Sequence, residues 1–238
     1  MKVTLVQSSP KLNRSNLRDM IVVIKEHIHV SDIIVFPELS LNGYLLQDKL
    51  HEDAWRIEEL DALKELSKDI DIIVGAAMRD GKVFRNASLY FSKGKLLSQH
   101  YKVHLPNYGM FEEARYFDAG KVFEGFLTQF GKVSMLVCED LWHAGVHSQL
   151  FAENPDYIIA LVASPARGFD DNGLLIEDQW YALLKSVALQ CDAKVIFVNR
   201  VGFEDGLGFW GGSCIVDRDA RIIYKLPQYE QDVKTFEI

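Results

Sequence analysis

"KVSMLVCEDLW", residues 132–142, is an apolar run that ends abruptly in a cysteine, two acids and a tryptophan. The apolar part is typical of a buried strand. A strand-to-helix turn beginning at Cys138 would place the sulfur at an edge of a sheet, facing backbone N–H groups that lower a thiol pKa and stabilise an oxyanion. A cysteine after an apolar run is more often a small buried side chain than a nucleophile. The interpretation of this thiol therefore depends on the rest of the chain.

The wider sequence alternates short β-branched runs with helical patterns, which is typical of an α/β sandwich. "DIIVF" (32–36) and "DIIVGAAM" (71–78) are continuously apolar, as strands buried on both faces are. Residues 103–120 show almost no periodicity and predict a long loop, which is often functional. Further strands are predicted at 3–7, 82–91, 95–102, 132–137, 156–162, 194–199, 209–216 and 221–226, and helices at 17–28, 53–68 and 175–191.

Composition and charge exclude several classes of protein. The 238 residues are 48% hydrophobic and 25% charged, which is ordinary for a globular enzyme. The net charge of −8, without a basic stripe, argues against a nucleic-acid partner. The apolar runs are too short to span a bilayer, and "MKVTLVQSSP" at the N-terminus lacks the pattern of a secretory signal. We therefore expect a cytoplasmic protein with no membrane partner.

Cysteine spacing and linker content bear on the organisation of the chain. The three cysteines are widely spaced and form no CxxC pair, so they predict neither a disulfide framework nor a zinc cage. No stretch rich in Pro, Ser or Gly divides the sequence. We expect a single domain over residues 1–238, with at least one free thiol and with no metal or cofactor.

Two other strand ends carry charged residues that suit a thiol nucleophile. Glu38 follows an apolar strand and is flanked by Phe36 and Leu39, which would desolvate a general base. Lys102 ends the strand "LLSQHYK". Taken alone, such a glutamate is more often a solvated loop carboxylate and such a lysine a surface charge. A cysteine nucleophile, however, needs both a base and a cation that stabilises the tetrahedral intermediate, so with Cys138 they form a candidate set.

These residues lie in three blocks through which the chain resembles the nitrilase, or carbon–nitrogen hydrolase, superfamily. The blocks are "FPELSLNGY" around Glu38, "YKVHLPNYGMFEEARYF" around Lys102 and "VCEDLW" around Cys138, in the family order. "LPNYGMFEEARYF", "CEDLW" and "NRVGFEDGLGFWGGS" (199–213) resemble more narrowly the glutaminase domain of glutamine-dependent NAD synthetases. The implied fold is a four-layer α-β-β-α sandwich with the reactive residues at strand ends.

The resemblance implies a Glu–Lys–Cys triad. In it Glu38 is the general base, Lys102 the oxyanion stabiliser and Cys138 the nucleophile. The second active-site glutamate of the family corresponds to Glu113, and its neighbour Glu112 is the less favoured choice.

The implied reaction is hydrolysis of a small primary carboxamide, such as glutamine or another ω-amide, through a cysteine acyl-enzyme, with release of ammonia and a carboxylic acid. The likeness to the glutaminase domain places Tyr108, Ser164 and Arg167 at the amide substrate. The turn after Cys138 adds the backbone N–H of Glu139 as an oxyanion donor. Carbamoyl compounds and nitriles stay open as substrates, and the family implies a homodimer or higher homo-oligomer.

One departure from the glutaminase-bearing synthetases concerns the ATP-using domain, with its pyrophosphate loop, which this sequence lacks. We therefore expect a free-standing amidase or a subunit that supplies ammonia to a separate partner. A catalytically silent partner subunit is the non-enzyme alternative, although no block shows damage to the triad.

Histidines near the cysteine support two rival interpretations. Glu139, His143 and His147 are spaced i, i+4 and i+8, which on a helix would form one face, as in a zinc-dependent hydrolase. That motif lacks the usual Glu beside its first His, and no third ligand is evident. Alternatively, Cys138 pairs with His143 or His104, as in cysteine proteases.

Overall fold

Two six-stranded sheets form the centre of the protein, which a computed structural model describes over residues 1–171 and 173–238. The first sheet has the order β16 (Asp232–Glu237), β1 (Lys2–Gln7), β2 (Ile33–Val35), β3 (Asp71–Asp80), β4 (Val83–Ser92) and β5 (Lys95–Tyr101). The second has the order β15 (Ile222–Lys225), β14 (Cys214–Val216), β11 (Lys194–Asn199), β8 (Tyr157–Val162), β7 (Gly131–Val137) and β6 (Phe126–Thr128). The strands β1–β2–β3 and β7–β8–β11 are parallel, and antiparallel strands flank them.

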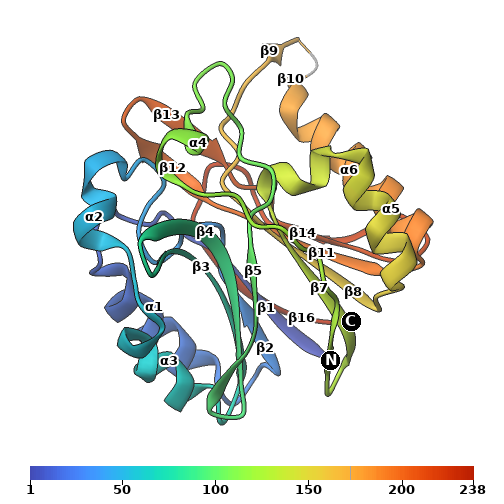
Figure 1. Ribbon diagram of the computed structural model, residues 1–238. Helices are drawn as coiled ribbons and strands as arrows, with labels where there is room; N and C mark the ends of the chain where they lie inside the picture. The colour runs from blue at the N-terminus through green and yellow to red at the C-terminus, as the bar shows by residue number, and fades with distance from the viewer. Residues whose placement is uncertain (172) are drawn as a thin grey trace.

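Helices cover the outer face of each sheet (Figure 1). One outer layer contains α1 (Asn16–His27), α2 (Leu50–Asp53) and α3 (Asp61–Leu66), with the 3-10 turns η1 (Gln47–Lys49) and η2 (Ile57–Leu60). The other contains α5 (Ala144–Glu153) and α6 (Leu175–Cys191). The four-layer α-β-β-α sandwich is thereby confirmed.

Loops and short elements gather at one end of the sandwich, the upper end in Figure 1. They are α4 (Glu113–Tyr116), the hairpin β12 (Val201–Glu204) to β13 (Leu207–Trp210), and the pair β9 (Phe169–Asp170) and β10 (Gly173–Leu174). The chain termini lie at the opposite end, where the Met1 amino group donates to the Ile238 carbonyl at 3.1 Å.

The central strands contribute side chains to two cores at once. In β8, Ile159 and Leu161 pack between the sheets, whereas Ile158, Ala160 and Val162 pack against the layer of α5 and α6. Successive side chains of a strand point to opposite faces, so a strand covered on both sides must be apolar throughout. Each buried Ile or Leu of this kind contributes about 1.5–3 kcal/mol of transfer free energy. This double burial explains the continuous apolar runs of the sequence.

The helix predicted at 53–68 is wrong in its first half. Trp55 is extended and bridges to β3: its N–H donates to Ala77 O at 2.8 Å, and its carbonyl accepts from Arg79 N–H at 2.7 Å. η2 and α3 begin only after this bridge. The backbone bonds to the sheet decide the conformation here, where the apolar periodicity favoured a helix.

The strand predicted at 209–216 is interrupted. Gly211 and Gly212 have φ of +74° and +63°, in the left-handed region, and separate β13 from β14. The strands β6 and β16 and the helix α5 were not predicted. In the residues that the structure describes, no helix is both long enough and apolar enough to cross a membrane.

Candidate active site

Cys138 stands at the junction of β7 and a 3-10 turn, η3 (Cys138–Trp142). Its φ is 44°, in the left-handed region that residues other than glycine rarely adopt. Such a conformation persists only where the surroundings hold it, and it is concentrated at functional sites. The Asp140 carboxylate contributes to that hold, because its Oδ2 accepts the Val137 N–H at 3.1 Å. The turn that the sequence predicted at this cysteine is present.

Asp140 also ties η3 to the segment that follows Lys102. Its Oδ1 accepts hydrogen bonds from the N–H groups of Val103 and His104 at 3.1 and 2.9 Å. Its Oδ2 lies 2.8 Å from His100 Nε2, and the side chain is fully buried. One buried carboxylate therefore fixes both the turn of the cysteine and the chain on either side of the lysine.

Glu38 follows β2 in a buried turn and is 1% exposed. The side-chain amide of Asn86, on β4, donates to its Oε1 at 2.8 Å. The backbone N–H of Ala163, just after β8, donates to its Oε2 at 2.8 Å. Both sheets therefore contribute a donor that orients this carboxylate.

Lys102 follows β5 and is likewise 1% exposed. Its Nζ lies 2.8 Å from Glu38 Oε1 and 2.8 Å from Glu113 Oε1. Its own backbone N–H donates to Asn86 O at 2.8 Å, which places the lysine beside the residue that orients Glu38. One buried ammonium thus bridges two buried carboxylates.

The structure distinguishes between the two adjacent glutamates of the loop. Glu113, the first residue of α4, is buried and accepts the Tyr44 hydroxyl at 2.6 Å in addition to Lys102. Glu112 is exposed and lies 3.5 Å from Arg115. Only Glu113 of these two joins the charged cluster, and it is the glutamate that the family resemblance favoured.

The charges of this cluster act on the titration of its members. Burial and then Glu38 raise the pKa of the Cys138 thiol well above its usual value, although Lys102 opposes them. Burial raises the pKa of Glu113 to about 6 against the attraction of Lys102. Burial alone would lower the pKa of Lys102, but Glu113 and Glu38 together raise it well above its usual value. At neutral pH the lysine is therefore a cation and the resting thiol is protonated.

Tyr108, one of the predicted substrate-binding residues, contacts the side chain of Glu139 in η3. The Tyr108 hydroxyl lies 3.0 and 2.9 Å from the two carboxylate oxygens of Glu139. Burial, followed by the hydrogen bond to Glu139, raises the pKa of Tyr108 to about 12. The Arg167 guanidinium lies 5.9 Å from the ring centre of Phe111, in the same loop as Tyr108. A carboxylate, a guanidinium and a phenol therefore lie near one another, and the charges of Glu139, Arg167 and Cys138 all act on the pKa of Tyr108.

Ser164, the remaining predicted substrate-binding residue, is buried. Its hydroxyl accepts the Trp180 indole N–H at 2.9 Å, and its backbone N–H donates to Asn199 Oδ1 at 2.9 Å. It directly follows Ala163, whose N–H holds Glu38. Ser164 therefore anchors the strand end beside the base.

The histidines do not form the helical face required by the zinc alternative. The backbone at His143 is extended, between η3 and α5, so Glu139 and His147 belong to different helical segments. His147 Nε2 lies 2.8 Å from the Leu141 carbonyl, and His143 stacks on His104 with ring centres 3.5 Å apart. Over residues 1–171 and 173–238 there is no cluster of three or more His, Cys, Asp or Glu suited to a metal.

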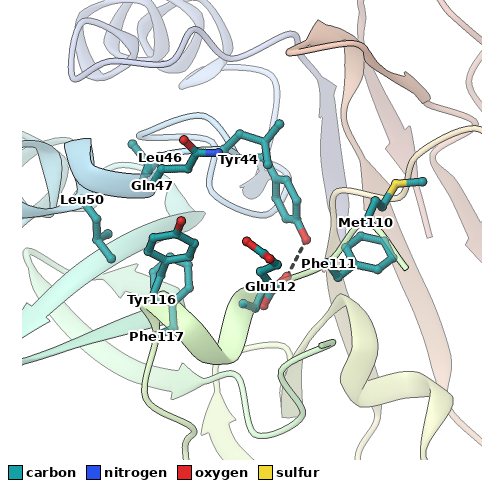
Figure 2. Close-up of a pocket in the computed structure, with 11 residues that line it drawn as sticks. Tyr44, Leu46, Gln47, Leu50, Met110, Phe111, Glu112, Tyr116 and Phe117 are labelled. Carbon is teal, nitrogen blue, oxygen red and sulfur yellow. Dashed lines mark hydrogen bonds between the residues drawn. The ribbon is translucent and has the colours of Figure 1, made fainter. Parts of the chain in front are cut away.

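A pocket of about 80 Å³ meets the charged cluster at Tyr44 and Glu113. Figure 2 shows the Tyr44 side chain in this pocket, where the dashed line marks its hydrogen bond to Glu113. The rings of Tyr116, Phe117 and Phe111 lie around the pocket. The remaining lining residues are Leu45, Leu46, Gln47, Leu50, Met110 and Glu112. The pocket is thus lined mainly by apolar side chains, together with the carboxylates of Glu112 and Glu113.

Sequence reasoning missed Tyr44 and Asn86, which hold Glu113 and Glu38. Tyr44 ends the block "FPELSLNGY", so its proximity to Glu38 in the chain was an available signal. Asn86 lies within a strand of ordinary composition, and no pattern in the sequence marks it.

Comparison with known proteins gives a consistent result. The sequence model of the carbon–nitrogen hydrolase family matches residues 2–238. The glutamine-dependent NAD(+) synthetase of Acinetobacter baylyi is 30% identical over 241 residues, which cover 98% of this chain and 43% of that protein. The Aquifex aeolicus enzyme of the same name is 31% identical over 227 residues, 92% of this chain and 39% of its own. The chain thus spans less than half the length of these curated relatives.

Solved structures agree on the fold. Glutamine-dependent NAD+ synthetase from Acinetobacter baumannii superposes with a TM-score of 0.87 and 29% identity, covering 98% of this chain and 44% of that one. A mutant form of an amidase of the nitrilase superfamily from Nesterenkonia gives a TM-score of 0.82 and 20% identity, covering 100% of this chain and 90% of that one. At that identity the amidase is similar to this chain in fold alone.

Proposed function

Because the chain belongs to the carbon–nitrogen hydrolase family, we propose that it hydrolyses a small primary carboxamide through an acyl-enzyme on Cys138. The observation that carries the proposal is the position of Lys102 Nζ, 2.8 Å from both Glu38 and Glu113 in a buried cluster whose charges act on the thiol. A buried ammonium beside a cysteine supplies the cation that a tetrahedral oxyanion needs, and a buried carboxylate supplies the base.

In the first half of the reaction Glu38 takes the thiol proton as the sulfur attacks the amide carbon. The raised pKa of Cys138 makes this transfer necessary at neutral pH, because the resting thiol holds its proton. The carbonyl oxygen becomes an oxyanion that Lys102 and the backbone N–H of Glu139 stabilise. Glu38 then gives the proton to the amide nitrogen, the C–N bond breaks, and ammonia leaves a thioester on Cys138.

In the second half a water molecule loses a proton to Glu38 and attacks the thioester. The tetrahedral intermediate collapses with the sulfur as the leaving group, and the thiol recovers its proton. Glu113 Oε2 is buried and, within the described residues, has no hydrogen-bond partner, so it is available to accept a bond from the substrate amide. We assign it to orientation of that amide while its Oε1 holds Lys102.

The substrate class that we favour is a glutamine-like ω-amide. The two curated synthetases to which the chain is similar are glutamine-dependent by name. The Glu139 carboxylate and the Arg167 guanidinium are opposite charges near Tyr108, and both act on its pKa. An amino acid carries an ammonium and a carboxylate that would match such a pair.

The proposal is tested by ammonia release from glutamine, asparagine, simple aliphatic amides, carbamoyl compounds and nitriles. Wild type and Cys138→Ala are assayed together. Ammonia that appears with an ω-amide and disappears in the variant supports the proposal. Preference for a carbamoyl compound or a nitrile would show that the substrate is not an ω-amide. Activity that persists in Cys138→Ala would refute the mechanism.

A further inference from the structure

A buried ion pair outside the charged cluster joins Arg200, the residue before β12, to Glu204, the last residue of β12. Arg200 Nη1 donates to Glu204 Oε2 at 2.9 Å, and the two side chains are 1% and 8% exposed. Arg200 Nη2 also donates to the Pro10 carbonyl at 3.3 Å. Arg200 and Glu204 lie in the stretch "NRVGFEDGLGFWGGS" (199–213), to which the triad assigns no role.

The second oxygen of this carboxylate holds the turn that carries Tyr44. Glu204 Oε1 accepts the backbone N–H of Tyr44 at 2.8 Å and also that of Leu45. Gly43 approaches so closely that an added Cβ would lie 3.0 Å from Glu204 Oε2. The turn is therefore packed directly onto the carboxylate.

The same hairpin also contacts the ring of Tyr44. Phe209 of β13 meets it edge to face, with ring centres 5.9 Å apart. The Arg200 guanidinium lies 4.1 Å from the centre of the Phe209 ring on the hairpin itself. Backbone and ring of Tyr44 are thus fixed from one side, while its hydroxyl reaches Glu113 at 2.6 Å.

We propose that the Arg200–Glu204 ion pair is a positioning element for the reactive centre: it fixes Tyr44 so that the hydroxyl holds Glu113 against Lys102. The consequence for catalysis rests on the proposed function; the effect on Cys138 reactivity does not. Burial, and then the charge of Glu113, raise the pKa of Tyr44 well above its usual value, so the hydroxyl keeps the proton that it donates.

A buried ion pair is weak grounds for a purely stabilising role. Its desolvation cost often exceeds the attraction, and apolar residues of similar volume serve stability equally well. A carboxylate that accepts two backbone N–H groups, however, defines the position of a turn in a way that an apolar side chain does not. The two bonds from Glu204 to the turn therefore favour a role in positioning Tyr44.

The test is a double-mutant cycle with Tyr44→Phe, Glu204→Gln and the double variant. Two rates are measured: alkylation of Cys138 by iodoacetamide, which needs no substrate, and kcat/KM for the best amide. Each single substitution is expected to lower both rates by about tenfold or more, as for a charge-assisted hydrogen bond. Because Glu204 acts through Tyr44, the double variant should be no slower than the slower single variant.

A pH profile separates positioning from general destabilisation. Glu113 is faced by Lys102, Glu38 and Tyr44, and the Tyr44 bond lowers its pKa. At low pH, protonation of Glu113 should reduce kcat/KM, which gives the pH profile an acid limb. Loss of the Tyr44 bond should raise the pKa of Glu113 and so move this limb to higher pH, equally in Tyr44→Phe and in Glu204→Gln. Tyr90→Phe is the matched control: it removes a buried 2.8 Å bond from a tyrosine to Asp71 near the chain termini and should lower the melting temperature without moving the limb.

Losses that multiply in the double variant would overturn the inference, as would a Glu204→Gln variant that melts earlier but alkylates normally. If Glu204→Gln does not fold, Glu204→Asp replaces it in the cycle, because the shorter acid keeps its charge beside Arg200 but reaches Tyr44 less well. In a further outcome, the protein releases no ammonia from any amide while the alkylation losses of Tyr44→Phe and Glu204→Gln still fail to multiply in the double variant. That result would refute the proposed amidase activity and uphold the positioning role.

Discussion

Gly75 of β3 lies directly against the backbone of Leu39, the residue after the candidate base. A Cβ added to Gly75 would lie 2.4 Å from Leu39 N and 2.4 Å from Pro37 O, far inside any real contact. The close approach lets Leu41 N–H donate to Gly75 O at 3.0 Å and seats the turn of Glu38 on the sheet. Only glycine permits this packing.

Gly75→Ala should therefore displace the turn of Glu38. We expect a loss of about 3 kcal/mol in the free energy of unfolding, of the size seen for overpacked cores, together with loss of ammonia release. Gly145→Ala is the control, since Gly145 lies in α5 with nothing within 4 Å of an added Cβ. It should be neutral or stabilising by up to about 1 kcal/mol. Urea unfolding of both variants checks the difference, and equal stabilities would contradict it.

Glu38→Gln should lower kcat/KM by at least about 100-fold, since the amide keeps the shape of the side chain but removes the base. The Cys–His alternative with His104 or His143 predicts little change. Steady-state ammonia release distinguishes the two. Retention of most activity would remove Glu38 from the mechanism and revive the histidine.

Lys102→Met should leave Glu38 and Glu113 as two buried carboxylates without their cation. Breaking a buried pair of this kind typically costs about 3–5 kcal/mol. The folded pair should then bind a proton more readily than the unfolded chain, so stability is retained at low pH and lost as pH rises. Thermal melting of the variant at pH 5 and pH 8 checks this: its deficit relative to wild type should be smaller at pH 5. A deficit independent of pH would argue against the electrostatic cause.

Glu113 should set an acid limb in activity near pH 6. Its pKa of about 6 lies above the ordinary value of 4.5, so the folded protein holds this proton more tightly than the unfolded chain. The stabilisation is complete below about pH 4.5 and is lost as pH rises through 6, a change of about 2 kcal/mol. Glu113→Gln should flatten this dependence of stability and remove the limb, whereas Glu112→Gln, at an exposed neighbour, should alter neither. A limb unchanged in Glu113→Gln would assign it to another group.

The oligomeric state expected from the family resemblance has a specific candidate surface. We propose that α5 and α6 pack against a second copy, because Phe151 on α5 is 66% exposed and Leu189 on α6 is 61% exposed. Light scattering of wild type should then give a multiple of the 27.1 kDa chain mass, and Phe151→Asp should give the single mass. Phe203→Asp, on the hairpin β12–β13, is the control and should leave the mass unchanged. A monomeric wild type would refute the proposal.

The fold could be predicted wherever burial dictated the pattern. The strands at 132–137 and 194–199 agree with β7 and β11 because both faces of each are covered, and only an apolar run satisfies that. The prediction failed at Trp55, where backbone bonds to β3 replaced a helix, and at Gly211–Gly212, where the chain leaves one pair of strands for another sheet. Both depend on partners distant in sequence.

By itself the sequence determined which residues stand at three strand ends, Glu38, Lys102 and Cys138, because a strand followed abruptly by a polar residue is a local pattern. Only the tertiary structure decided what surrounds them. It joined Glu113 to Lys102, added Tyr44 and Asn86 to the cluster, and connected Tyr44 to Glu204 and Arg200. The physical reason is that hydrogen bonds and ion pairs are decided within a few ångströms, whereas periodicity specifies only the face or the end of an element on which a side chain lies.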